Sequence, residues 1–295
     1  MPARLPSVPA EPIAAGGPRR SPSVRAVPAP AVPGAAGAVR IREVPAVRRA
    51  MAILHHLARH AEGLGVSRIA RDLEIIPSTC LHILRELVAA RLVAFEPNGK
   101  LYRLGLGVLG LAREVSRQHP FIQVAQPRLQ RFARDFHVSA AATQRDGEDM
   151  VVVAVATAAE GDAVAVGNRV PCLASASGRL IAAFSGWTGA QLQTRFERVR
   201  WQRAPDFRKW LREVRQAGER GHALDEGQFR LGITAIAAPV FGPDGTVSHT
   251  LTINVVSAQL DARRRATFID AVVRTSAEIA AALEGRPGAR SARNP

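Results

Sequence analysis

The sequence has very little lysine and cysteine and no long hydrophobic run. Lysine occurs only at Lys100 and Lys209, and the two cysteines, Cys80 and Cys172, stand far apart in no metal-ligand spacing. A disulfide framework and a cysteine-based metal site are therefore disfavoured. Because no stretch of 18 apolar residues and no secretory hydrophobic segment occurs, we expect a soluble, cytoplasmic protein with no membrane partner.

The motifs of common enzymes and cofactor sites are also missing. There is no GxSxG nucleophile elbow, no phosphate-binding glycine loop and no HExxH pattern. His56 and His60 stand four residues apart, and without that pattern we interpret them as an exposed histidine face of a helix. Neither His222 nor His249 lies in a recognisable base arrangement. We predict no catalytic residue, no metal, no cofactor and no enzymatic activity.

Arginine is what the sequence has in quantity. Lysine and arginine together number 40 against 25 acidic residues, which gives a formal net charge of +15. Guanidinium groups bind phosphate and guanine in a bidentate manner, so this balance favours a nucleic-acid partner. An arginine-rich genome that encodes arginine wherever a solvated cation is needed would explain part of the same excess.

Both ends of the chain have the composition of disordered tails. Residues 1–44 contain nine of the 20 prolines and show no hydrophobic period, and residues 285–295 are similar. Such segments bury too little apolar surface to offset the entropy lost on ordering. The ordered part is expected to begin near Val44.

Three predicted helices and a hairpin follow one another between residues 45 and 104. Apolar residues at helical spacing predict the first helix, and Ser67 is the predicted N-cap of a short second one. Pro77 ends that second helix, and Ser78 or Thr79 is predicted to cap a third. Two short helices joined by a tight turn after a longer helix form a helix-turn-helix pattern.

The third helix and the hairpin together suggest binding to duplex DNA. One face of the helix is apolar, and the other carries hydroxyl, imidazole and guanidinium groups near its N-terminus. Pro97-Asn98-Gly99 is a strong turn signal, and a basic hairpin behind a third helix is a wing. An ordinary amphipathic surface helix is the alternative. The predicted DNA-binding residues are Ser67, Arg68, Ser78, Thr79, His82, Arg85, Asn98, Lys100 and Arg103.

The rest of the chain mixes helical and strand-like patterns. We predict a linker helix over 105–118 and an α+β domain over 119–284, in which helices surround an antiparallel sheet. Strands are expected at 138–144, 149–157, 163–170, 234–241 and 247–256, and helices at 120–136, 188–198, 206–219 and 262–283. The small-residue segment at 172–184 is expected to lead into a further helix.

Five segments in this order give the chain a family resemblance over residues 45 to about 284. They are SRIARDLEIIPSTCLHILRELVAARLV, GKLYRLGLGVLGLA, PCLASASGRLIAAF, RGHALDEGQFRLGITAIAAPVFGPDG and the closing helix. In them the chain resembles the IclR-type bacterial transcriptional regulators. The resemblance implies a winged helix-turn-helix DNA-binding domain over 45–104, a GAF-like effector-sensing domain over 119–284, and a homodimer or homotetramer.

The resemblance also implies a pocket for a small effector, expected to be a carboxylate. Main-chain amides of Ala176 and Ser177 would hold the carboxylate, and Asp225 would stand where an acidic pocket residue is found. Thr252 and Asn254 are two residues apart, so on a strand their side chains lie on one face and can point into the same cavity. The alternative is that the strand is half-exposed and both side chains face solvent. The other expected pocket positions are Val170, Ile233 and Ala235.

The sequence departs from the family pattern at two positions. His82 stands where an arginine is usual in the recognition helix, and Gly227 stands where a second acidic residue is common. Two rival functions stay open beside a ligand-responsive regulator. One is an architectural protein that coats DNA without sequence preference, and the other is an enzyme of the second domain.

Overall fold

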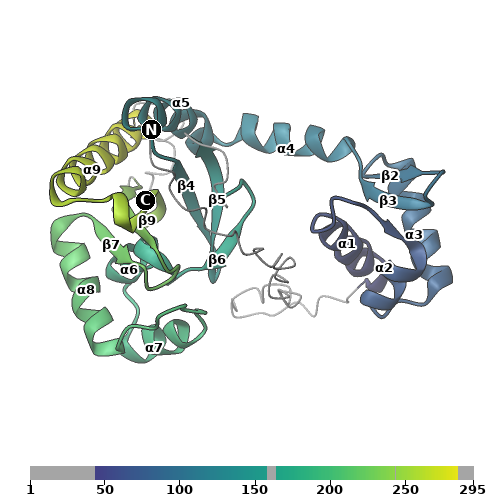
Figure 1. The fold of residues 1–295 in the computed structure, drawn as a ribbon, viewed down its shortest axis with the longest axis horizontal. Helices are drawn as coiled ribbons and strands as arrows, with labels where there is room; N and C mark the ends of the chain where they lie inside the picture. The colour runs from purple at the N-terminus through teal and green to yellow at the C-terminus, as the bar shows by residue number, and fades with distance from the viewer. Residues whose placement is uncertain (1–43, 158–163, 243, 285–295) are drawn as a thin grey trace, which may run out of the picture. The chain divides into compact units, whose positions relative to one another are not determined.

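The computed structural model describes residues 44–157, 164–242 and 244–284 (Figure 1). The tails predicted at 1–44 and 285–295 lie outside the described residues, apart from Val44. In the described ranges, no helix combines the length and the hydrophobicity that crossing a bilayer requires.

The first folded part is a three-helix unit with a small antiparallel sheet. Strand β3 lies between β1 and β2 in that sheet. The predicted helices and hairpin are therefore present, and the two-residue β1 is an addition too short to show any sequence period. The elements are α1 (Pro45–Leu57), β1 (Leu64–Gly65), α2 (Val66–Asp72), α3 (Pro77–Ala89), β2 (Val93–Glu96) and β3 (Leu101–Leu104).

A separate apolar core holds this unit together. Ile53, Ile69 and Leu84, one from each helix, are fully buried in it. His56 is buried as well, and its Nε2 lies 3.2 Å from Oδ2 of Asp72, which joins α1 to α2. The expectation of an exposed histidine face was wrong for His56, because a carboxylate partner from the next helix makes its burial tolerable.

The predicted helix caps were wrong. Gly65 is the N-cap of α2 and Ile76 is the N-cap of α3, and neither helix has a side-chain capping bond. Pro77 at the first position of α3 has no N–H to satisfy and a φ already suited to a helix, so this helix starts without a polar cap. The residues predicted as caps lie within the first turns instead: Ser67, Ser78 and Thr79.

The second folded part is built on a six-stranded antiparallel sheet in the order β6-β5-β4-β9-β8-β7. The strand expected at 163–170 is shorter and later than predicted, because Gly167, at φ +88°, turns the chain just before it. The strands are β4 (Ala140–Asp146), β5 (Asp149–Ala156), β6 (Arg169–Pro171), β7 (Ala223–Glu226), β8 (Ile233–Phe241) and β9 (Val247–Val256).

Helices cover both faces of this sheet. One face packs on α5 and α9, where Ile236 and Leu251 join an aliphatic and aromatic core. The other face packs on α6, where Ala235 and Ala237 belong to the same apolar cluster as Leu180. The helices are α4 (Gly107–Gln118), α5 (Pro120–Phe136), α6 (Ser175–Phe184), α7 (Gly189–Glu197), α8 (Phe207–Arg220) and α9 (Ala262–Glu284), with a short 3-10 helix at Ser257–Gln259.

Candidate functional sites

The outer face of α3 carries the polar side chains that the sequence predicts for it. Ser78, His82 and Arg85 are exposed, and Leu84 on the opposite face is fully buried. Arg85 has no ion pair among the described residues, so its guanidinium is available to a phosphate or a base edge. Thr79 is half-buried beside them.

The hairpin between β2 and β3 supplies a second cation. The turn closes with the N–H of Lys100 donating to the carbonyl of Pro97 at 3.3 Å, and Lys100 takes a left-handed φ of +50°. Asn98 and Lys100 are both exposed at this tip. Among the described residues Lys100 has no acidic partner, so its charge adds to that of Arg85.

Two predicted cations are partly neutralised instead. The guanidinium of Arg103 lies 3.1 Å from Glu96 across the hairpin, and Nε of Arg68 lies 3.6 Å from Asp72 one turn along α2. The Arg103 pair depends on strand register, which the sequence alone did not specify. Of the predicted DNA-binding arginines and lysine, Arg85 and Lys100 are therefore the two without an ion pair among the described residues.

A second group of predicted residues surrounds the start of α6. Ser175 has a φ of +60°, an unusual value for a residue with a side chain, and Gly178 donates the first helical bond to Ala174. The N–H groups of Ala176 and Ser177 precede that bond and have no acceptor within the helix. A Cβ on Gly178 would lie 2.0 Å from the carbonyl carbon of Leu173, so only glycine allows this approach.

A network of buried hydroxyls lies directly below these amides. Oγ of Ser177 is 2.9 Å from Oγ1 of Thr250 and 2.8 Å from Oγ1 of Thr252. Thr143 on β4 extends the network, with its Oγ1 2.7 Å from that of Thr250. Thr252 is thus buried rather than solvent-facing. The sequence prediction missed Thr143 and Thr250, although Thr250 continues the alternation of Thr252 and Asn254.

Strand register brings the remaining predicted residues to the same face of the sheet. Asp225 on β7 pairs with Ala235 on β8, which pairs with Asn254 on β9, so the three side chains form one row. Ile233 lies on the same face, two residues before Ala235. Val170 on β6 is opposite Met150 and packs against the core that includes α6. Asn254, Ile233 and Val170 are only half-buried.

An arginine that the sequence prediction missed organises this face. The guanidinium of Arg179 is 1% exposed and donates to Glu213 at 2.7 Å and 2.9 Å, to Asp225 at 3.3 Å and to the carbonyl of Ser175. Oδ1 of Asp225 accepts from the backbone N–H groups of Gln228 and Phe229. The Asp225 carboxylate therefore already has three hydrogen-bond partners within the protein.

Comparisons with known proteins cover most of the chain. The family model described as IclR helix-turn-helix domain matches residues 46–97, and the one described as Bacterial transcriptional regulator IclR C-terminal matches residues 113–281. The chain is 25% identical over 256 residues to the HTH-type transcriptional repressor AllR of Escherichia coli K12, covering 85% of this chain and 94% of that protein. The AllR of Salmonella typhimurium is 24% identical over 260 residues, with 86% and 96% coverage.

Solved structures share the fold. An IclR transcriptional regulator from Alicyclobacillus acidocaldarius aligns with a TM-score of 0.72 at 23% identity, over 81% of this chain and 99% of its own. An IclR homologue from Microbacterium hydrocarbonoxydans, crystallised with 4-hydroxybenzoate, aligns with a TM-score of 0.69 at 17% identity, over 82% and 100%.

Proposed function

The chain belongs to the IclR family of bacterial transcriptional regulators, and we propose which of its residues bind operator DNA and which bind the effector. Membership implies binding to DNA through the helix-turn-helix and a response to a small molecule. The DNA site is supported by the exposed polar face of α3 and by a wing whose lysine has no acidic partner in the described part of the chain. Base edges would meet Ser78, His82 and Arg85, and phosphates would meet Ser67, Arg68, Thr79, Asn98, Lys100 and Arg103.

Two substitutions separate base contacts from phosphate contacts. If Arg85 binds a base, Arg85→Ala weakens operator binding by about 1 to 3 kcal/mol and relaxes specificity at one position. Lys100→Ala weakens binding to every duplex and lowers the slope of log affinity against log salt by about one unit. Arg208→Ala, at an exposed site on α8, is the control and leaves both quantities unchanged. Normal binding and salt dependence in both variants would remove the proposed interface.

We also propose that the effector is a small organic or aromatic acid bound at the start of α6. Its carboxylate would accept from the amides of Ala176 and Ser177, which a helix N-terminus favours by a few tenths to about 1 kcal/mol. Asn254 would donate to another ligand oxygen, and the side walls would be Val170, Ile233, Ala235 and Thr252. Asp225 would form the floor of the pocket, where its carboxylate pairs with the guanidinium of Arg179. The bound 4-hydroxybenzoate of the Microbacterium hydrocarbonoxydans relative supports an acid of this type.

The effector site is tested by thermal shift with a panel of small carboxylic and aromatic acids. An acid at 100 times its dissociation constant stabilises the protein by about 2.7 kcal/mol. Asn254→Leu should abolish this shift and the DNA response while operator binding without effector persists. Gln193→Leu, on the exposed surface of α7, should keep both responses. A full response in Asn254→Leu would place the effector elsewhere.

The assembly we propose is a homodimer through α4, with a homotetramer as the larger alternative. Among the residues of α4, none is buried, and Leu109, Leu111 and Val115 are 65%, 62% and 60% exposed. Two winged helices on one pseudo-palindrome also bind more tightly than one. Leu111→Glu should convert the dimer into monomers in sedimentation velocity, whereas a wild-type protein that is already monomeric at micromolar concentration would contradict this assembly.

The rival functions are less well supported. Ser177, the serine that a hydrolase would need, is 6% exposed and bonded to two threonine hydroxyls rather than to a histidine. We therefore propose no enzymatic role. A DNA-coating protein would bind all duplexes alike, whereas a regulator keeps a large ratio between operator and non-operator affinity, so competition with random-sequence DNA separates the two.

A further inference from the structure

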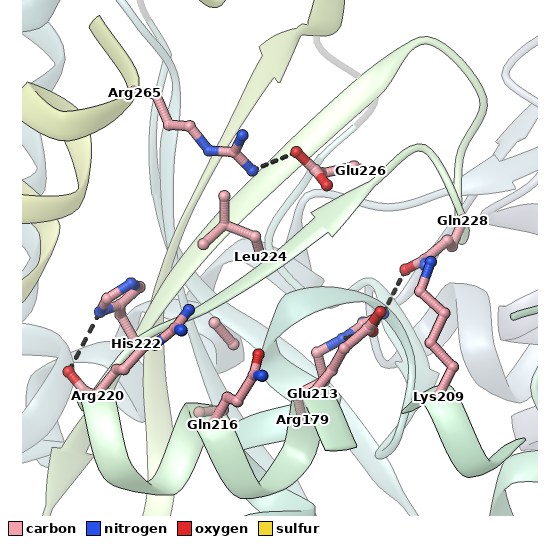
Figure 2. Close-up of a pocket in the computed structure, with 12 residues that line it drawn as sticks. Arg179, Lys209, Glu213, Gln216, Arg220, His222, Leu224, Glu226, Gln228 and Arg265 are labelled. Atoms are coloured by element: carbon pink, nitrogen blue, oxygen red, sulfur yellow. Dashed lines mark hydrogen bonds and ion pairs between the residues drawn. The ribbon is translucent and has the colours of Figure 1, made fainter. Parts of the chain in front are cut away.

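A polar groove runs along α8, outside the hydroxyl network below α6. Its volume is about 230 Å³, and it lies between α8, the edge strand β7 and the first turn of α9 (Figure 2). Lys209, Glu213, Gln216 and Arg220 follow one another at spacings of four, three and four residues, so α8 turns one face into the groove. Arg179, Ala217, His222, Ala223, Leu224, Glu226, Gln228 and Arg265 complete the lining.

The acidic side chains of this groove are already paired. Glu213 accepts from the buried guanidinium of Arg179 at 2.7 Å, and Glu226 pairs with Arg265 at the opposite wall. Lys209 and Arg220 are exposed and have no ion pair in the part of the chain that the structure describes. Two positive charges are therefore left for a ligand.

These two cations stand at opposite ends of the groove. Eleven residues of helix separate them, which is roughly 16 Å along the axis. Figure 2 shows Gln216 and Leu224 between Arg220 on one side and Lys209 on the other. Between these ends the lining consists of the neutral Gln216 and Leu224 and of charged side chains that already pair with one another, so the unpaired positive charge lies at the two ends.

We propose that this groove binds an elongated α,ω-dicarboxylate, at a site distinct from the one proposed for the effector at α6. One carboxylate pairs with Arg220 and the other with Lys209, while the methylene chain lies over Leu224 and Gln216 donates to a carboxylate oxygen. An ion pair at an exposed cation contributes little by itself, so a ligand needs both ends to bind measurably. A monocarboxylate or a short dicarboxylate reaches only one cation.

The test is calorimetric titration of the full chain at constant ionic strength. The probes are succinate, adipate, suberate and sebacate, with hexanoate and octanoate as single-ended controls. Affinity should rise with dicarboxylate length to an optimum and exceed that of the monocarboxylate of equal length. Lys209→Gln and Arg220→Gln should each lower the affinity of the best dicarboxylate about 2- to 5-fold, as expected for an exposed pair of up to about 1 kcal/mol.

Two further variants identify where the dicarboxylate binds. Arg215→Gln removes an exposed cation from another face of α8 and should leave the affinity unchanged. Asn254→Leu removes the proposed effector contact and should also leave dicarboxylate binding intact. Loss of binding in Asn254→Leu alone would overturn the groove site while supporting the α6 site. Equal affinity for one and two carboxylates, an equal loss in Arg215→Gln, or no binding at millimolar concentration would also overturn it.

Discussion

The two faces of the six-stranded sheet differ in chemistry although the same strands form both. On β9, Leu251 and Ile253 enter the apolar core under α5 and α9, while Thr250 and Thr252 enter the hydroxyl network under α6. Burying apolar groups stabilises directly, whereas buried polar groups only recover their desolvation cost when they are fully bonded. Burial on the apolar face is therefore stabilising in itself, whereas the polar groups under α6 are costly to leave without a partner and can also serve a ligand.

The largest loss of unfolding free energy is expected from a substitution on the polar face. Arg179→Ala leaves the Asp225 carboxylate buried without its cation, which should cost about 3 to 5 kcal/mol of unfolding free energy. Urea unfolding measures this value. Arg131→Ala is the control, since its ion pair with Glu278 is largely exposed and should be worth no more than about 1 kcal/mol. A loss below about 1 kcal/mol for Arg179→Ala would mean that water or a neighbouring side chain readily replaces this guanidinium.

The next largest loss of unfolding free energy is expected from a cavity on the apolar face. Leu251→Ala removes a fully buried side chain and should cost about 2 to 5 kcal/mol in urea unfolding. Because Leu251 points away from α6, the stabilisation that an acid ligand gives should be the same as in the wild type. Leu231→Ala, at a side chain that is 59% exposed, should change stability by less than about 0.5 kcal/mol. A Leu251→Ala variant that lost only the ligand response would contradict the division between the faces.

The apolar face also contains a titratable group, His249 on β9. Its ring lies 3.9 Å from that of Phe121, and burial, with a smaller contribution from His119, lowers its pKa to about 4. In the unfolded chain this pKa is near 6.5, so the unfolded state binds more protons as pH falls below that value. The stability from neutral His249 is complete above pH 6.5 and is lost as pH falls toward 4.

Unfolding at pH 7 and pH 5 measures this loss. The wild type should lose about 2 kcal/mol through His249, from 1.5 pH units at 1.36 kcal/mol each. His249→Leu should lose correspondingly less between the two pH values, and His55→Gln, at an exposed histidine of α1, should behave as the wild type. Equal pH dependence in His249→Leu would show that other groups cause the acid sensitivity.

Much of the fold follows from local patterns in the sequence. Helical spacing indicated α1 to α3, the Pro97-Asn98-Gly99 turn indicated the wing, and GPDG indicated the hairpin of β8 and β9. These features depend on residues close together in the chain. The two-residue β1 and the four-residue β7 are too short to show a period, and they form because neighbouring strands offer them hydrogen bonds.

The candidate sites were only partly predictable, because side-chain pairing depends on tertiary contacts. Arg179 and Asp225 are 46 residues apart, and no sequence spacing marks them as partners. The neutralisation of Arg103 by Glu96 likewise depends on hairpin register. The resemblance placed Ser177 and Thr252 near one another, but the bond between their hydroxyls became evident only when α6 was set on the sheet.

The smallest effect on stability should come from the hydroxyl network. Thr252→Val keeps the shape of the side chain and removes one hydrogen-bond partner of Ser177, whose Oγ still lies 2.9 Å from Oγ1 of Thr250. The expected cost is about 0.5 to 1.5 kcal/mol, the usual value of a neutral hydrogen bond. Because Thr252 lies beside the proposed carboxylate site, the same variant should reduce the thermal shift by acid ligands more than Leu251→Ala does. Thr234→Val, at a buried threonine bonded to Ser257, is the matched control and should lose similar stability with no change in ligand response. If the two threonine variants respond to ligand alike, the hydroxyls under α6 serve packing alone and the polar face loses its proposed role.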